Sequence, residues 1–421
     1  MYHLSQRLQR RGHKVIIITH SYGSRVGVRY LTSCVKVYYI PSWLIANQVI
    51  LPTIYTFFPL FRSIMIRENI DIVHGHQSFS PLCHEAILHA RTMGLKVVFT
   101  DHSLNGFQDT ASILTNKLLK FTLSDIDHVI CVSHTSKENT VLRASLDPWD
   151  VSVIPNAIIS TQFTPDPTQR HPRKVTIVVA SRLVYRKGID LLVTVIPNIC
   201  EKYPDVDFLI AGDGPKRIDL EQMREYHVLQ DRVTLLGALR QTEIRDVLVK
   251  GHIFLNTSLT EAFCIAIVEA ASCGLLVVST EVGGIPEVLP EHMIFLAQSN
   301  TDAIVQSIDR AIEKVKHGRI NPFEIHNQVA NMYSWDDVAE RTEVIYKDIM
   351  KKSEISLIER LERYHGCGIF AGKLGVMIMT VHYLFYLLLE WLIPRDSIDA
   401  APAFDRDMFW DYCVNMKGYK E

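Results

Sequence analysis

The chain lacks the short motifs that identify several common classes of enzyme and binding protein. Its eight cysteines are scattered and form no C-x-x-C pair, so neither a zinc site nor a disulfide framework is indicated, and the pattern fits a reducing compartment. H-E-x-x-H, G-x-x-x-x-G-K-[ST] and G-x-S-x-G are all missing, which removes the simplest metalloprotease, nucleoside triphosphatase and α/β-hydrolase interpretations. An excess of positive charge is missing too: 44 lysines and arginines stand against 46 aspartates and glutamates, so we expect no nucleic acid partner.

Metal-binding signals are also weak. The pattern Asp-x-Asp occurs three times, at 125/127, 205/207 and 405/407. The first two pairs come just before predicted strands, which is the wrong end of a parallel sheet for a ligand site, and the third pair is in the C-terminal tail. We interpret all three pairs as solvated charge, and we expect neither a metal nor another cofactor.

The sequence does contain a regular alternation of strand and helix patterns. Apolar runs such as Lys96–Thr100 and Val175–Ala180 alternate with helical patterns such as Pro81–Thr92 and Arg217–Tyr226. Continuous apolar strands with helices between them predict parallel sheets that are covered on both faces. We therefore expect an α/β protein with two doubly wound, Rossmann-like domains, and a ligand in the cleft beyond the carboxyl ends of their strands.

The expected domain order follows from shifts in composition along the chain. We expect an N-terminal Rossmann-like domain at 1–162, a proline-rich linker at 163–173, a second Rossmann-like domain at 174–330, helices that pack back at 331–365, a transmembrane helix at 368–393 and a short lumenal tail at 394–421. The chain starts inside an amphipathic helix, without the strand that normally opens an α/β domain.

The apolar stretch at 368–393 is long enough to cross a bilayer, which takes about 20 residues. Tyr383 and Trp391 suit the aromatic belt at a membrane interface. Four basic residues precede the stretch, so the positive-inside rule places the bulk of the chain in the cytoplasm and the tail across the membrane. A buried amphipathic helix is the alternative.

The segment at 256–289 carries the strongest indication of a binding site. It places Glu261 and Glu269 eight positions apart, so if a helix starts at Cys264 the two lie roughly on one side, about two turns apart. Such carboxylates can accept hydrogen bonds from two hydroxyl groups of one elongated ligand. Unpaired N–H groups at the helix start, near Phe263–Ile265, can bind a phosphate. The pattern predicts a nucleotide sugar, and a buried alanine-rich helix with a capping glutamate is the structural alternative.

Other polar residues follow predicted strands. Arg182 and Lys187 come after one strand and could hold a diphosphate, although a solvated basic loop would look the same. Gly212 follows the next strand, in a turn that lets a ligand approach the backbone or simply reverses the chain. His102 follows a strand of the first half and could contact a sugar or act as a general acid or base, or it could be structural.

Taken together, these motifs resemble those of a known family. SRLVYRKG at 181–188, GDGPKR at 212–217, TEAFCIAIVEA at 260–270 and GGIPEV at 283–288 resemble the retaining GT-B glycosyltransferases of the glycogen-synthase-like and sucrose-synthase-like group. Longer stretches, among them FTDHSLNGF and CVSHTSKENTVLRA, resemble more specifically the catalytic subunits of phosphatidylinositol N-acetylglucosaminyltransferases. The resemblance extends from residue 1 to about residue 393.

The resemblance implies a fold and an activity. The fold would be GT-B, with the N-terminal domain on the acceptor side and the second domain binding the nucleotide sugar. The reaction would transfer N-acetylglucosamine from UDP-GlcNAc to phosphatidylinositol with retention of configuration, the first step of GPI-anchor biosynthesis. The protein would be a single-pass protein of the endoplasmic reticulum membrane with cytoplasmic catalytic domains, in a complex with other subunits.

The resemblance also implies roles for individual residues. Arg182 and Lys187 would bind the donor diphosphate, Glu269 would accept the ribose hydroxyls, and Glu261 and His102 would act at the transferred sugar. The donor site would be completed by Gly212, Phe263, Cys264 and Ile265.

One departure from the family pattern concerns the beginning of the chain. Family members begin with a strand and a Gly-Gly loop that approaches the donor phosphates. We therefore expect the N-terminal sheet to lack a central strand, and the chain as written to be inactive or weakly active. A GT-B transferase for another nucleotide sugar and lipid acceptor, or a non-catalytic membrane scaffold, are further alternatives.

Overall fold

The computed structural model describes residues 1–402 and 404, apart from 32–34, 42–43, 47–48, 51–52, 105–109 and 319. The chain forms two compact units. The first unit comprises residues 1–132, 137–154 and 335–421, and the second comprises residues 133–136 and 155–334. Residues 163–173, expected to be a linker, lie inside the second unit. The Asp-x-Asp pair at 405/407 lies outside the described residues.

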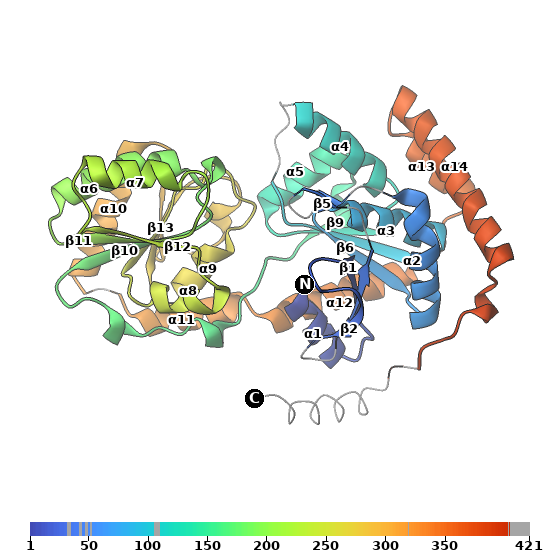
Figure 1. Ribbon diagram of the computed structural model, residues 1–421, viewed down its shortest axis with the longest axis horizontal. Coiled ribbons are helices and arrows are strands. Elements are labelled where there is room, and N and C mark those ends of the chain that lie inside the picture. Colours follow the sequence, from blue (N-terminus) through green and yellow to red (C-terminus); the bar gives the residue numbers. More distant parts are fainter. Residues whose placement is uncertain are drawn as a thin grey trace. The chain divides into compact units, whose positions relative to one another are not determined.

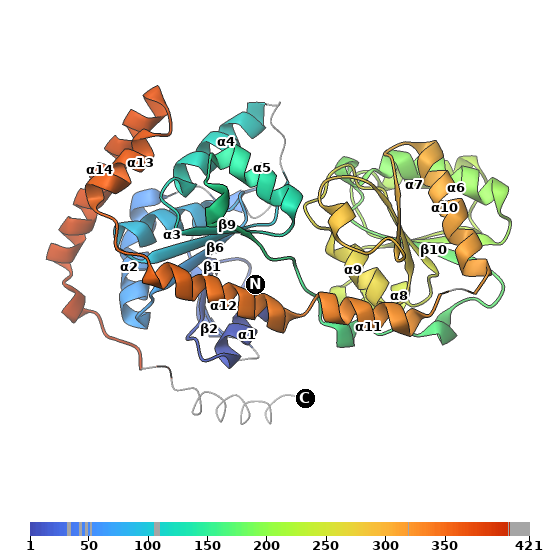
Figure 2. The ribbon, with the colours of Figure 1, turned by 180° about the vertical axis from the view of Figure 1, so that it is seen from behind.

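The second unit is built on a six-stranded parallel sheet in the order β12-β11-β10-β13-β14-β15. Its strands are β10 (Val175–Ala180), β11 (Val206–Ala211), β12 (Val233–Gly237), β13 (Ile253–Asn256), β14 (Leu276–Thr280) and β15 (Ile294–Ala297). Its helices are α6 (Ile189–Lys202), α7 (Arg217–Tyr226), α8 (Gln241–Leu248), α9 (Ile265–Ser272), α10 (Thr301–Lys316) and α11 (Pro322–Met332). Helices α6, α7 and α10 lie on one face of the sheet and α8, α9 and α11 on the other (Figures 1 and 2).

The central strands of this sheet are buried because helices cover both faces. Five of the six residues of β10 are buried, including Ile177 and Val178, whose side chains point to opposite faces. The apolar stripe of α6, with Leu192 and Ile196 fully buried, packs on one of these faces. The range predicted for β10, Val175–Ala180, is confirmed, since a continuous apolar run marks the strand.

The first unit contains two larger sheets instead of one continuous parallel sheet. One has the order β1-β3-β2 and the other is parallel with the order β6-β7-β8-β9. The strands are β1 (Ile16–His20), β2 (Gly27–Tyr30), β3 (Lys36–Ile40), β6 (Ile72–His76), β7 (Lys96–Asp101), β8 (His128–Cys131) and β9 (Val151–Val153), with a separate hairpin of β4 (Leu44–Ala46) and β5 (Val49–Ile50). The expectation of purely parallel sheets was wrong here, because β2 pairs with β3 in the antiparallel direction.

Eight helices belong to the described part of the first unit. They are α1 (Tyr2–Arg10), α2 (Ile54–Glu68), α3 (Pro81–Thr92), α4 (Thr110–Leu123), α5 (His134–Ala144, whose first turn is counted with the second unit), α12 (Trp335–Lys351), α13 (Leu357–His365) and α14 (Ile369–Leu392). The chain therefore returns to the first unit after completing the second, and its C-terminal helices α12–α14 pack there.

Helix α14 is long and apolar enough to cross a membrane. One helix of this kind is found within the described part of the chain. A stripe at three- and four-residue spacing, from Gly372 to Leu389, is buried against the first unit. Polar contacts hold it there: ring nitrogens of His89 and His382 lie 2.8 Å apart, and Arg62 Nε donates to Glu390 at 2.9 Å. The remaining sides of α14 expose large apolar side chains.

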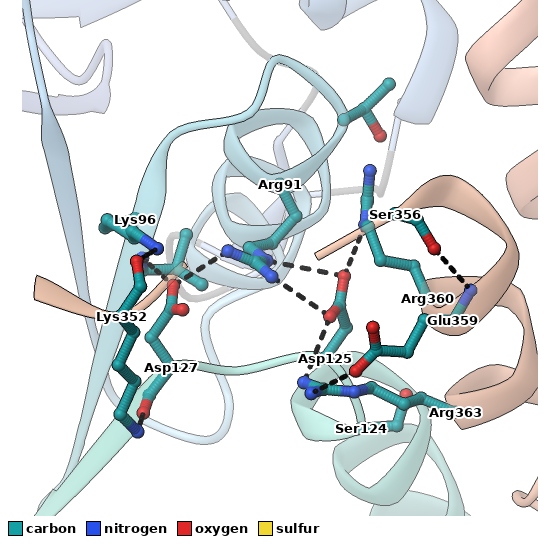
Figure 3. Close-up of polar contacts among 12 residues, drawn as sticks. Arg91, Lys96, Ser124, Asp125, Asp127, Lys352, Ser356, Glu359, Arg360 and Arg363 are labelled. Carbon is teal, nitrogen blue, oxygen red and sulfur yellow. Dashed lines mark hydrogen bonds and ion pairs between the residues drawn. The ribbon is translucent and has the colours of Figure 1, made fainter. Parts of the chain in front are cut away.

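A buried ion cluster joins α13 to the first unit (Figure 3). Asp125 is 1% exposed and accepts from Arg360 Nε at 2.6 Å and from Arg91 Nη2 at 3.1 Å. Asp127 is also buried and accepts from Arg91 Nη1 and from the backbone N–H of Val97, both at 2.8 Å. The interpretation of this Asp-x-Asp pair as solvated charge was therefore wrong: both carboxylates are buried and paired.

The second Asp-x-Asp pair is only half-buried and is also engaged by cations. Asp205 pairs with Lys316 at 2.6 Å, and Asp207 pairs with Lys174 and Arg232 at 2.8 Å each. No group of three or more potential metal ligands occurs among the residues that the structure describes.

Candidate functional site

The predicted site residues of the second unit gather where the strand order of its sheet reverses. On one side of β10 lie β11 and then β12, and on its other side lie β13, β14 and then β15. The loops after β10 and β13 therefore leave the sheet side by side in opposite directions, which opens a crevice at the carboxyl edge. Lys187 ends the loop after β10 and Glu261 lies in the loop after β13, and their side chains form an ion pair.

This ion pair is partly shielded and further fixed by hydrogen bonds. The Lys187 side chain is 22% exposed and the Glu261 side chain 14%. Ser258 Oγ donates to Glu261 Oε1 at 2.9 Å, and the N–H of Gly284 donates to the Glu261 carbonyl at 3.0 Å. The carboxylate of Glu261 and the ammonium of Lys187 are thus held together at the crevice.

The two loops also lock through backbone contacts. Thr257 Oγ1 donates to the Lys187 carbonyl at 3.0 Å, and the N–H of Leu259 donates to the Arg186 carbonyl at 2.9 Å. Gly188 has φ +66°, and a Cβ there would lie 1.8 Å from the Thr257 carbonyl oxygen. Only glycine fits this position, because any side chain would clash with the neighbouring backbone and strain its own.

Gly212 has a structural reason of the same kind. A Cβ there would lie 1.8 Å from the Ser181 carbonyl oxygen, and its N–H donates to the Gly237 carbonyl at 2.8 Å. The turn after β11 is therefore packed tightly on the loop after β10. A direct contact between Gly212 and a donor stays a prediction.

Helix α9 begins at the same crevice. Its N-cap residue, Cys264, has φ +63° and no side-chain cap hydrogen bond, and its carbonyl already accepts the N–H of Ile267 at 3.1 Å. A helix start can bind an anion through its other first-turn N–H groups. Phe263 is buried with its ring edge-on to Tyr333, whereas Ile265 is 41% exposed. Burial and the nearby Glu261 raise the pKa of the Cys264 thiol to about 12, so it stays protonated at neutral pH.

Glu269 lies on α9, about one turn after the first helical residue, Ile265. Its side chain is half-buried, and burial raises the pKa of its carboxyl group to about 7. No hydrogen bond from the described residues reaches this carboxylate. A desolvated carboxylate without donors is suited to accept hydroxyl groups of a ligand.

Arg182 is exposed after β10, and no side chain in the described parts of the structure pairs with it. It therefore supplies a guanidinium whose charge is not balanced locally, in contrast to the ammonium of Lys187. A planar guanidinium without an ion-pair partner is suited to donate paired hydrogen bonds to a diphosphate.

His102 lies in the first unit, directly after β7, and is exposed. Its Nε2 is 3.2 Å from Nδ1 of His76, the last residue of the neighbouring strand β6. Burial lowers the pKa of His76 well below its ordinary value, so this imidazole is neutral. His102 thus lies at the carboxyl end of the parallel sheet, and its contact with a ligand stays a prediction.

Asp101, which precedes His102, is a functional candidate that the sequence analysis missed. It is fully buried, and its carboxylate accepts from Ser78 Oγ at 2.8 Å, from Thr140 Oγ1 at 3.1 Å and from the backbone N–H of Ser103 at 3.0 Å. It thereby fixes the loop that carries His102. The available signal was an aspartate that ends an otherwise apolar buried strand.

Comparisons with known proteins show the family to which the chain is similar. Residues 20–109 match the family described as PIGA (GPI anchor biosynthesis), and residues 161–319 match the family Glycosyl transferases group 1. The chain is 57% identical over 406 residues to the phosphatidylinositol N-acetylglucosaminyltransferase gpi3 subunit of Schizosaccharomyces pombe, a match that covers 96% of this chain and 89% of that protein. It is 55% identical over 403 residues to a phosphatidylinositol N-acetylglucosaminyltransferase subunit of Homo sapiens, with 95% and 83% covered.

Solved structures show the same architecture at low sequence identity. Sucrose-phosphate synthase from Thermosynechococcus elongatus has a TM-score of 0.68 at 20% identity and covers 83% of this chain and 92% of that one. HepE from Anabaena, in complex with UDP, has a TM-score of 0.67 at 15% identity and covers 82% and 95%. These likenesses confirm the expected GT-B fold.

Proposed function

Because this chain belongs to the family of phosphatidylinositol N-acetylglucosaminyltransferase subunits, we propose that it transfers N-acetylglucosamine from UDP-GlcNAc to phosphatidylinositol. This is hexosyl transfer, the first step of GPI-anchor biosynthesis. Relatives of this family match nearly the whole chain, at up to 57% identity. The comparisons do not favour the alternatives of an inactive or weakly active copy, another acceptor or a scaffold.

The observation that carries the proposal is the ion pair of Lys187 and Glu261 at the reversal of the strand order. Together with Arg182, it brings two cations to the carboxyl edge of a parallel sheet, where such folds bind nucleotides. We place the donor diphosphate on Arg182, Lys187 and the first-turn N–H groups of α9. The same groups would stabilise the departing UDP, which is where negative charge develops during transfer.

The carboxylates of Glu261 and Glu269 accept hydrogen bonds from hydroxyl groups of the donor. Glu269 accepts the ribose hydroxyls, because it is desolvated and lacks donors within the described structure. Glu261 stays at the transferred sugar, held there by Ser258 and Lys187. The charges of Lys187 and Glu261 cancel each other. The unpaired charge of Arg182 therefore makes the site positive overall, which favours binding of a diphosphate.

His102 contributes from the first unit, and Asp101 and His76 hold it in place. We assign it a contact with the transferred sugar. We propose that the acceptor hydroxyl attacks on the face from which UDP departs and passes its proton to the departing diphosphate, so that configuration is retained without a covalent intermediate on these residues.

We propose that the protein acts at a membrane, which the length and apolar character of α14 and the lipid acceptor support. We propose the endoplasmic reticulum membrane, with both units on the cytoplasmic side, the tail in the lumen and other subunits of a transferase complex as partners. The relatives are themselves named as subunits of a transferase, which supports such a complex.

Transfer assays test this function. A purified complex that contains this chain is given radiolabelled UDP-GlcNAc with phosphatidylinositol, phosphatidylcholine or phosphatidylethanolamine. We expect label only on phosphatidylinositol, and loss of most activity in Arg182→Ala and Lys187→Ala. Lys202→Ala is the matched control, because it breaks a surface ion pair between Lys202 on α6 and Asp309 on α10. Label on another lipid, or full activity of Lys187→Ala, would contradict the proposal.

A further inference from the structure

A pocket lies at the edge of the second unit's sheet that is opposite to the donor site. Its volume is about 380 Å³. It is lined by the segment that leads into β10, by His252 directly before β13, and by residues at the C-terminal end of α10 and just after it. The donor-site loops leave the carboxyl ends of these two strands. The pocket therefore belongs to the amino ends and shares no lining residue with the proposed donor site.

Two imidazoles of this pocket are fixed as hydrogen-bond donors. Nδ1 of His252 accepts the backbone N–H of Thr176 at 3.1 Å. Nδ1 of His171 accepts the N–H groups of Arg173 and Lys174, at 3.1 and 2.9 Å. A neutral imidazole whose Nδ1 accepts must carry its hydrogen on Nε2, so both rings offer a donor and no acceptor.

Arg170 adds a guanidinium with an unused donor. Its Nη2 donates to the Gly274 carbonyl at 2.8 Å, at the C-terminal end of α9. Its Nε is buried without a hydrogen-bond partner in the described structure. An unmatched buried N–H of a charged group is costly, on the order of a few kcal/mol, unless a ligand satisfies it.

The charge of the pocket has one sign. Its lining residues include no aspartate or glutamate, and the remaining walls are apolar or backbone, among them Pro172, Val315 and Ile320. Burial, together with the neighbouring Arg170 and His171, lowers the pKa of His252 to about 4. The guanidinium of Arg170 thus repels additional positive charge, and together with the two Nε2–H donors it would be stabilised by an anion.

We propose that this pocket, built from Arg170, His171 and His252, binds a phosphate group. A phosphate offers several acceptor oxygens to separate donors, which suits one guanidinium and two imidazoles better than a planar carboxylate. The volume leaves room for an organic group attached to the phosphate. Both a soluble phosphate compound and a phospholipid headgroup present this chemistry.

Calorimetry on the full chain in detergent tests the site. Saturating UDP is present throughout, so that the donor site cannot take the probe. The two probes are inorganic phosphate and glycerophosphoinositol, a soluble phosphodiester headgroup. We expect at least one to bind, and its affinity to fall at least about tenfold in Arg170→Gln and in His252→Asn, which is the effect of losing one charge-assisted hydrogen bond.

Matched controls separate this site from the donor site and from general charge. Arg173→Gln removes a neighbouring exposed charge that does not line the pocket, and should leave probe affinity unchanged. Unchanged UDP affinity of Arg170→Gln and His252→Asn shows that the unit is folded. A preference for inorganic phosphate indicates a soluble ligand, and a preference for glycerophosphoinositol a lipid headgroup. Binding of neither probe, or equal binding by Arg170→Gln, His252→Asn and the wild type, would overturn the proposal.

Discussion

Replacing Glu269 by glutamine should stabilise the second unit while weakening donor binding. Burial raises the pKa of this carboxyl group from 4.5 to about 7 in the folded protein. The folded state therefore holds a proton more tightly than the unfolded state, and ionisation of Glu269 destabilises the fold. This penalty is absent below pH 4.5, grows as the pH rises, and is complete above pH 7.

The size of the effect follows from the shift. A difference of about 2.5 pKa units corresponds to about 3 kcal/mol at about 1.4 kcal/mol per unit. Glutamine keeps the shape of the side chain without the charge. We therefore expect Glu269→Gln to raise the free energy of unfolding of the second unit by up to about 3 kcal/mol at pH 8, and by almost nothing near pH 4.5.

Hydrogen exchange of the full chain measures this gain, because peptides from β10 and β13 report on the second unit alone. Variant and wild type are compared at pH 8 and again at pH 5, so that the intrinsic exchange rate cancels. Glu243→Gln is the matched control: its carboxylate is exposed, and its pKa is lowered by hydrogen bonds with Arg240, so the substitution should not stabilise. A gain that is equal at both pH values, or no gain at pH 8, would refute the reasoning.

Three further predictions concern other parts of the chain. Asp101→Asn should lower both the melting temperature and the transfer rate, because an amide N–H₂ replaces an oxygen that accepts hydrogen bonds from buried donors. The expected loss in the free energy of unfolding is about 1–3 kcal/mol. A thermal scan and the transfer assay measure the two effects, and unchanged values would contradict the prediction. Asp125→Ala should cost about 3–5 kcal/mol, since it takes the ion-pair partner from buried Arg360 and leaves Arg91 with Asp127 alone. Asp205→Ala should cost at most about 1 kcal/mol, and equal urea midpoints for the two variants would contradict this. Gly188→Ala should abolish UDP binding in calorimetry, because its Cβ would displace the Thr257 backbone, and normal affinity would be the contrary result.

Sequence alone predicted the elements whose burial is complete. Strand β10 is apolar throughout because helices cover both of its faces, so its ends could be read from composition. Strand β2 was missed because all four of its residues are exposed, which leaves no pattern of apolar residues to detect. The same reason explains why its antiparallel pairing with β3 was not foreseen.

The sequence named candidate site residues but not their pairings. Glu261 and Glu269 stand in one segment, but they do not share a helix, because α9 begins at Ile265 and Glu261 lies in the preceding loop. The ion pair of Lys187 and Glu261 joins loops that are 74 positions apart, and only the strand order brings them together. Asp125 was misjudged for the same reason, since its partner Arg360 lies 235 positions away.

The central claim is that the donor binds where the strand order of the second unit reverses. A structure of the full chain with UDP bound, by cryo-electron microscopy of the complex, tests it most directly. We predict the diphosphate within hydrogen-bond distance of Arg182, Lys187 and the first-turn N–H groups of α9, with the ribose hydroxyls on Glu269. UDP at any other place, with Lys187 and Glu269 free of it, would contradict the account.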